Sequence, residues 1–148
     1  MARIHHSAIV TRDLAASLTF WRDGLGLDVL MDHSFEGPWP SLFGAATSEL
    51  HSVFLGETDD PASGIVELVV IEGTAPPGTE PVGPAEGFFL LSLYADLDAV
   101  LPRLAGLGVG GTPTVEAVGA VRLAVVHDPN GVRVELMDDG ARGGMASL

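Results

Sequence analysis

The sequence predicts an α+β fold in which one structural unit occurs twice. Residues 6–14 (His-Ser-Ala-Ile-Val-Thr-Arg-Asp-Leu) match residues 89–97 (Phe-Leu-Leu-Ser-Leu-Tyr-Ala-Asp-Leu), 83 positions later. Residues 65–69 (Ile-Val-Glu-Leu-Val) match residues 133–137 (Arg-Val-Glu-Leu-Met), 68 positions later. Each copy therefore runs from a strand through a capped helix to strands that end in Val-Glu-Leu.

The first copy begins with an apolar, branched strand over residues 3–10. A helix follows, with Thr11 or Asp13 as its cap and with four apolar residues at helical spacing: Leu14, Leu18, Trp21 and Leu25. We expect further strands over residues 27–31, 50–55 and 65–71. The two repeat spacings differ by 15 residues, which indicates an insertion in the first copy. The Pro/Gly/Ser-rich residues 33–47 are the candidate.

The second copy follows a proline-rich linker and begins with an apolar strand over residues 88–94. Its helix can be capped by Asp96 or Asp98, and Pro102 favours Asp98 because proline is tolerated near the first turn of a helix. Strands over residues 114–118, 121–127 and 132–137 complete it, with a turn at residues 128–131. We expect a first module at residues 1–72, a linker at 73–86, a second module at 87–138 and a flexible tail at 139–148.

Composition limits the classes of function. The chain has 148 residues, 47% of them hydrophobic, which suits one globular domain. Its formal charge of -13 argues against a nucleic-acid partner, since phosphate binding needs a basic face. No apolar stretch is long enough for a membrane span, and no signal peptide is evident, so we expect a cytoplasmic protein. Without cysteine, any metal must be held by imidazole and carboxylate groups.

Several of these motifs together resemble the vicinal oxygen chelate (VOC) superfamily, which includes glyoxalases, bleomycin-resistance proteins and extradiol dioxygenases. The motifs are His6 seven residues before Asp13, the helix end at residues 20–27 (Phe-Trp-Arg-Asp-Gly-Leu-Gly-Leu), Val-Glu-Leu at 66–68, and Asp-Pro-Asn-Gly at 128–131 before Glu135. The resemblance implies one VOC domain over residues 1–138. It would consist of two tandem βαβββ modules whose curled mixed sheet surrounds a cavity, usually within a homodimer.

The resemblance also implies a divalent metal ion held by the first and last strands of both modules. The corresponding positions are His6, Glu67, Phe89 and Glu135, of which Phe89 offers no lone pair. We expect His6, Glu67 and Glu135 to hold the metal, and Glu67 and Glu135 to be catalytic. Mn, Ni, Zn, Mg and Fe all remain candidates. A site that has lost its metal and keeps one protonated carboxyl group is the alternative.

The residues themselves support these assignments to different degrees. Glu67 lies in an apolar run, and an unpaired buried carboxylate costs several kcal/mol, so a partner or a metal is expected. His6 by pattern alone would be a core histidine, and strand alternation places His5 on the opposite face. Glu135 could instead pair with Arg133 at the surface.

Three further residues are candidates for substrate binding. Phe89 would form an apolar wall of the site. Trp39, between two prolines, could form an aromatic lid or simply anchor its loop, and His51 could line the cavity or face solvent.

Two functions follow. The first is a metal-dependent lyase, isomerase or dioxygenase that acts on a small oxygenated compound. The alternative is a metal-free protein of the bleomycin-resistance type that sequesters a small, drug-like or cationic aromatic molecule, favoured by the charge of -13 and by Phe89.

Overall fold

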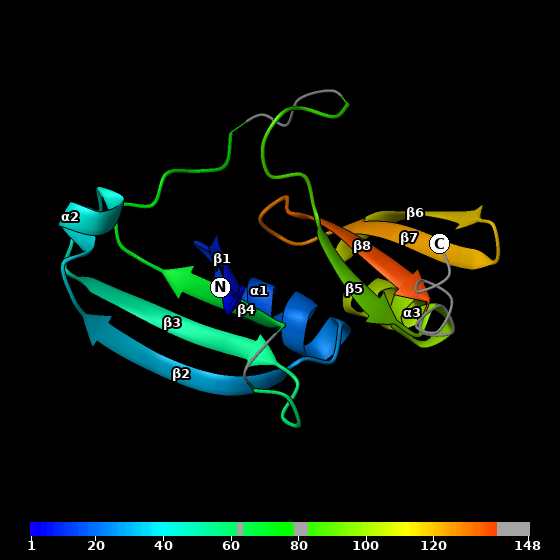
Figure 1. Cartoon of the computed structure of the whole chain (residues 1–148), viewed down its shortest axis with the longest axis horizontal. Helices are drawn as coiled ribbons and strands as arrows, with labels where there is room; N and C mark the ends of the chain where they lie inside the picture. Colours follow the sequence, from blue (N-terminus) through cyan, green and yellow to red (C-terminus); the bar gives the residue numbers. More distant parts are fainter. Residues whose placement is uncertain (62–63, 79–82, 139–148) are drawn as a thin grey trace. The chain divides into compact units, whose positions relative to one another are not determined.

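The computed structural model of the chain describes residues 1–61, 64–78 and 83–138. It divides into two compact units, Met1–Pro76 and Pro77–Leu148, so the division falls within the expected linker. Each unit contains one four-stranded mixed sheet, in which the first strand pairs in parallel with the last and the other pairings are antiparallel. The prediction of an α+β fold with two tandem βαβββ modules is confirmed (Figure 1).

Unit 1 runs in chain order through strand β1, two consecutive helical segments, strand β2, a short helix and two more strands. Asp13 caps the first helix by accepting a hydrogen bond from the backbone N–H of Ala16, as the sequence allowed. The sheet order is β1-β4-β3-β2, which leaves β1 and β2 at the edges. The elements are β1 (His6–Val10), α1 (Leu14–Leu18), π-helix η1 (Thr19–Gly24), β2 (Asp28–Glu36), α2 (Trp39–Phe43), β3 (Glu49–Gly56) and β4 (Ile65–Val70).

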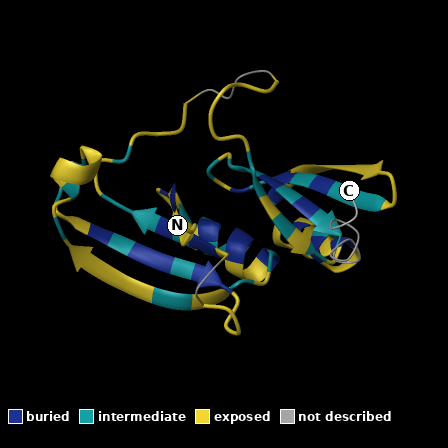
Figure 2. Ribbon diagram, in the orientation of Figure 1, coloured by how far each residue is buried: buried dark blue, intermediate teal, exposed yellow. Residues whose placement is uncertain are grey.

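The two faces of the unit 1 sheet differ in chemistry. Because paired residues share a face and neighbours in a strand alternate, Val53, Leu55 and Leu68 lie on one face, and all three are fully buried. They form the core of the unit with Phe20 and Trp21 of η1 (Figure 2). The opposite face carries a polar and aromatic set: His6, Ser52, Phe54 and Glu67.

Strand β2 is longer than the sequence suggested. It extends to Glu36, so the first four residues of the expected insertion belong to the strand. The connection from β2 to β3 contains α2 and spans residues 37–48, whereas the equivalent turn in unit 2 contains only Gly119 and Ala120. Most of the extra length of the first copy therefore lies in this connection. As an edge strand, β2 carries three carboxylates: Asp28, Asp32 and Glu36.

Unit 2 has the same topology with shorter connections. Its sheet order is β5-β8-β7-β6, and its buried hydrophobic side chains come from α3, β7 and β8. Strand β5 begins three residues later than expected, and β6 begins four residues earlier. The elements are β5 (Leu91–Ala95), α3 (Leu97–Leu107), β6 (Gly110–Val118), β7 (Val121–His127) and β8 (Arg133–Asp138).

The expectation that Asp98 caps α3 is wrong. The side chain of Asp96 caps the helix by accepting from the backbone N–H groups of Asp98 and Ala99. The carboxylate of Asp98 accepts instead from Arg122 of β7, at 2.9 Å. Pro102 consequently lies inside the helix, where it removes a single backbone donor.

Among the described residues, no helix is both long enough and apolar enough to cross a membrane. The expected flexible tail at residues 139–148 lies outside the described residues.

Candidate metal centre

Glu67 is the centre of a hydrogen-bonded cluster in unit 1. Its Oε2 lies 3.0 Å from Nε2 of His6 on β1, and its Oε1 accepts a 2.6 Å hydrogen bond from the hydroxyl of Ser52 on β3. The side chain of Glu67 is only 14% exposed, against 36% for His6. The carboxylate is therefore mostly withdrawn from water and held on both oxygens, as expected for a buried charge.

Strand geometry explains how one carboxylate occurs in an apolar run. Val66 and Leu68, the neighbours of Glu67 in β4, point into the core on the helical side of the sheet. Glu67 points to the other face, where Ala8 is its partner in β1 and Phe54 its partner in β3. The small side chain of Ala8 leaves room on this face, and the imidazole of His6 lies next to the ring of Phe54, with centroids 5.3 Å apart.

His5 belongs to the same cluster, contrary to the expectation that it points to the opposite face. Its Nδ1 lies 2.8 Å from Nδ1 of His6, and its ring lies 6.0 Å from the ring of Phe54. The alternation of side chains along a strand does not apply to His5, because β1 begins at His6. A carboxylate only accepts hydrogen bonds, so neutral His6 carries its proton on Nε2, toward Glu67, and accepts at Nδ1 from His5. Ser52 also belongs to this cluster, although no motif in the sequence marks it.

Glu135 has a simpler environment in unit 2. Its Oε1 accepts a 2.8 Å hydrogen bond from the hydroxyl of Ser92 in β5. The alternative of a surface pair with Arg133 is not what the structure shows, because the guanidinium carbon of Arg133 lies 4.8 Å above the ring of Phe89. This cation–π contact occupies the ring of Phe89, which is 48% exposed.

Strand register shifts the correspondence between the two copies by one residue. In unit 1, Ala8 pairs with Glu67, and His6 pairs with the residue two positions before it. In unit 2, Ser92 pairs with Glu135, so the counterpart of His6 is Leu90, one residue before β5, and not Phe89. The connection from strand to helix cap is one residue shorter in the second copy. Leu90, like Phe89, offers no lone pair to a metal.

The donors of unit 1 fit a divalent ion in chemistry and in spacing. An imidazole nitrogen and a carboxylate oxygen 3.0 Å apart are separated as two ligands of one metal ion would be. Across the described ranges, no group of three or more His, Asp or Glu side chains is arranged to hold a metal. Unit 1 thus brings two of the predicted ligands together, and Glu135, the third predicted ligand, belongs to unit 2.

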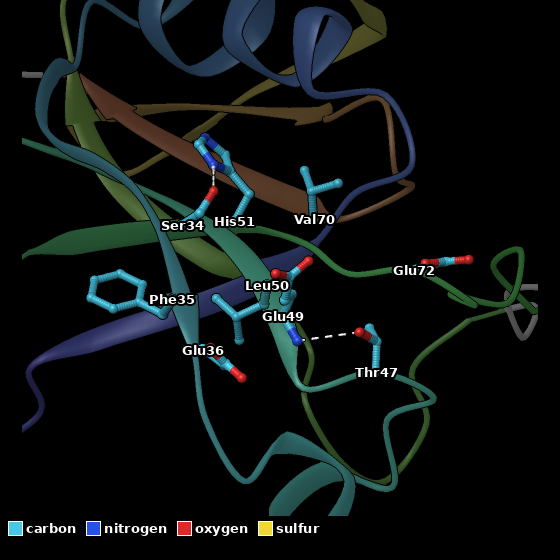
Figure 3. A pocket seen from close by; sticks show the side chains of 9 residues that line it. All are labelled: Ser34, Phe35, Glu36, Thr47, Glu49, Leu50, His51, Val70 and Glu72. Atoms are coloured by element: carbon cyan, nitrogen blue, oxygen red, sulfur yellow. Dashed lines mark hydrogen bonds between the residues drawn. The ribbon is translucent and has the colours of Figure 1, made fainter.

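The predicted substrate residues have defined local environments. The ring of Trp39 stacks on that of Phe43, with centroids 5.6 Å apart and an interplanar angle of 3°, and its Nε1 donates to the carbonyl of Phe35 at 3.4 Å. These contacts are those of a loop anchor. His51 lines a cavity of about 470 Å³ in unit 1 (Figure 3). Whether Trp39, His51 and Phe89 contact substrate stays a prediction.

The fold and this site define a class of protein, and comparison with known proteins agrees. The chain belongs to the glyoxalase/bleomycin resistance protein/dioxygenase superfamily, whose family model matches residues 3–136. The resemblance to the VOC superfamily is thereby confirmed.

One relative and two solved structures illustrate the similarity. The lactoylglutathione lyase-like protein terB of Aspergillus terreus (strain NIH 2624 / FGSC A1156) is 37% identical over 145 residues, which cover 90% of this chain and 74% of the relative. Glyoxalase I of Leishmania major shares 22% identity with a TM-score of 0.71, covering 99% of this chain and 94% of that one. A glyoxalase family protein of Bacillus cereus shares 19% identity with a TM-score of 0.72, covering 93% and 94%.

Proposed function

We propose that the protein is a divalent-metal-dependent enzyme of the lyase, isomerase or dioxygenase type that acts on a small oxygenated compound. The observation that supports this most is the His6–Glu67 pair, an imidazole and a carboxylate held together on the sheet face opposite the core. In this proposal His6, Glu67 and Glu135 are the metal ligands, with the metal drawn from Mn, Ni, Zn, Mg or Fe.

Each residue has a definite role in the proposed chemistry. A bound divalent ion would supply Lewis-acid stabilisation of negative charge that develops on a substrate oxygen. Ser52 holds Oε1 of Glu67, which keeps Oε2 directed at His6. Glu67 or Glu135 serves as the base that receives a proton from carbon. The hydroxyl of Ser92 holds Glu135 in the same way.

The relative's description favours a lyase within this range. A protein described as lactoylglutathione lyase-like is 37% identical to this chain over 145 aligned residues. We therefore rank lyase chemistry before isomerase or dioxygenase chemistry, with a homodimer in the cytoplasm as the working form. Sedimentation of the purified protein tests the homodimer.

Metal retention tests the proposal directly. The protein is dialysed against chelator, reconstituted separately with Mn, Ni, Zn, Mg and Fe(II), desalted and subjected to elemental analysis. We expect one metal per site in the wild type and loss of metal in Glu67→Gln. Glu49→Gln is the matched control, because Glu49 is an exposed glutamate of the neighbouring strand β3. Failure of every metal to be retained, or equal retention in Glu67→Gln, contradicts the proposal.

A metal-free binding protein is the second candidate, and one observation favours it. The register counterpart of His6 in the second copy is Leu90, so one of the four ligand positions has no donor. The charge of -13 then favours cationic ligands. In that case the dialysed protein binds a cationic aromatic dye with unchanged affinity after addition of metal, and Glu67→Gln retains no less metal than the wild type.

A further inference from the structure

Unit 1 carries a second constellation of reactive groups, separate from the His6–Glu67 pair. His51 of β3 lies between two side chains of β2: its Nδ1 is 2.8 Å from the hydroxyl of Ser34, and its Nε2 is 2.7 Å from Oδ1 of Asp32. His51 pairs with Val70 in β4, three residues from Glu67, so the two constellations lie on opposite faces of the sheet.

The strand register fixes this arrangement. Ser34 is directly opposite His51 in the antiparallel β2–β3 pair, and Asp32 is two residues before Ser34 on the same face. A carboxylate only accepts, so Nε2 of His51 carries the proton donated to Asp32. Nδ1 then has a lone pair, and the hydroxyl of Ser34 donates to it. A hydroxyl that donates to a basic nitrogen, on a ring that a carboxylate orients, is the arrangement of an activated nucleophile.

These groups open onto a cavity of the size that a small molecule needs. Ser34 and His51 both line the cavity of about 470 Å³ (Figure 3). The side chain of His51 is 33% exposed, so a ligand can reach it.

The cavity lining indicates the class of substrate. Glu36, Glu49 and Glu72 contribute carboxylates, whereas no arginine of the described part of the chain lines the cavity. Phe35, Leu50 and Val70 add apolar surface. Such a lining attracts a cation with an apolar body and repels an anion.

From this geometry we propose that Ser34, His51 and Asp32 form a second catalytic site, an acyl-transfer site for small esters or thioesters that bear a positive charge. Ser34 Oγ attacks the acyl carbon, so that the Oγ–C bond forms and the bond to the leaving oxygen or sulfur breaks. The proton of Ser34 passes to Nδ1 of His51 and then to the leaving group. A water molecule, deprotonated by Nδ1 of His51, then attacks the acyl carbon. The Oγ–C bond breaks, His51 returns that proton to Ser34 Oγ, and the acid is released. Asp32 accepts from Nε2 throughout and holds the ring.

Hydrolysis of acetylthiocholine, measured with chelator present so that no metal takes part, tests the proposal. The released thiol is detected with a disulfide reagent, to which the cysteine-free chain contributes nothing. We expect Ser34→Ala to reduce the rate to that of buffer and Asp32→Asn to lower it about a hundredfold. Ser41→Ala, in the exposed helix α2, is the matched control and should match the wild type. A rate that Ser34→Ala leaves unchanged overturns the proposal.

A comparison of a cationic with an anionic thioester tests the proposed positive charge of the substrate. S-acetylthioglycolate is the anionic counterpart of acetylthiocholine, and we expect the wild type to hydrolyse the cationic thioester at least about tenfold faster, an effect typical of a focused surface charge. Glu36→Gln combined with Glu49→Gln should reduce that preference. Equal rates for the two thioesters overturn the substrate class.

A thiol substitution gives a readout that does not depend on turnover. Ser34→Cys introduces the sole thiol of the chain, and His51 should draw its proton and raise its reactivity. We expect iodoacetamide to alkylate Ser34→Cys at least about tenfold faster than Ser41→Cys, with the site located by mass spectrometry. Equal alkylation rates mean that His51 does not activate this position, which contradicts the proposal.

Discussion

The hydroxyl of Ser52 in β3 donates a 2.6 Å hydrogen bond to Oε1 of Glu67, from a residue that is 1% exposed. A short bond from a buried hydroxyl to a carboxylate is among the stronger hydrogen bonds in proteins. It leaves Oε2 of Glu67 for His6 and determines where the carboxylate points. Ser52 is therefore a positioning residue for the proposed metal site.

Ser52→Ala should destabilise unit 1 and weaken metal binding together. The loss of a hydrogen bond to a charged, mostly buried group costs about 1.5–3 kcal/mol in the free energy of unfolding. Urea denaturation of the metal-free protein measures this cost, and metal titration measures the loss of affinity. Ser92→Ala is the control for the unfolding measurement, because Ser92 makes the equivalent bond to Glu135 at an exposed position. If Ser92→Ala costs as much as Ser52→Ala, burial is not what strengthens the Ser52 bond.

Leu90→His should restore a ligand in the second copy. Register makes Leu90, and not Phe89, the counterpart of His6. If the four ligand positions converge, an added imidazole increases metal affinity and therefore the metal-dependent gain in Tm. Phe89→His, one residue away, should give no such gain and should lose the contact with Arg133. Tm measured with and without Ni or Zn distinguishes the two variants, and a gain in Phe89→His alone would contradict the register argument.

Arg122→Met should destabilise unit 2 in a pH-dependent manner. Arg122 of β7 donates to Asp98 of α3 and to Asp138 of β8, so it connects helix and sheet. The hydrogen bond from Arg122, together with its charge, lowers the pKa of Asp98 below its ordinary value. A lowered carboxyl pKa contributes stability above the pKa of the unfolded chain and loses it as the pH falls through the folded value. The Tm difference between wild type and Arg122→Met should thus be present at pH 7 and shrink below about pH 4. A difference independent of pH would show that packing alone accounts for Arg122.

Asp96→Ala should cost about 1 kcal/mol in unfolding free energy, because the first turn of α3 loses its side-chain cap. Asp96→Ser keeps a capping oxygen and should recover most of that stability. Urea unfolding of both variants provides the measurement. Equal stability of Asp96→Ala and Asp96→Ser would mean that the cap contributes nothing.

The fold was largely predictable because it rests on local and repeated signals. Strand alternation around Glu67, the Asp13 cap and the Asp-Pro-Asn-Gly turn each have a periodic or steric cause that sequence displays. The cap of α3 was mispredicted for a tertiary reason. Asp98 is engaged by Arg122, 24 residues later, and this contact is invisible to a local helix rule.

The site was predictable only in part, because its geometry depends on register. The repeat in the sequence located Glu67 and Glu135. The connection from the first strand to the helix cap is one residue shorter in the second copy, so the sequence match assigned Phe89 as the counterpart of His6, whereas the strand register assigns Leu90. Ser52 and His51 are neighbouring residues of β3, and their side chains lie on opposite faces of the sheet. Their partners, Glu67 and Asp32, lie on different strands, so cross-strand pairing had to be known before either contact could be assigned.

The edge strand β2 has a consequence for how molecules meet in solution. An open edge offers unpaired backbone groups to any other strand, and this is a common origin of aggregation. Here Asp28, Asp32 and Glu36 recur at intervals of four residues along that edge strand. Asp32 and Glu36 share one face, whereas the bulge between Val29 and Met31 places Asp28 on the other. A second copy that approached edge to edge would bring its own row of carboxylates against them. Repulsion between like charges therefore disfavours pairing between the β2 strands of two copies. Small molecules can still approach β2, which carries Ser34 and Asp32 of the proposed acyl-transfer site.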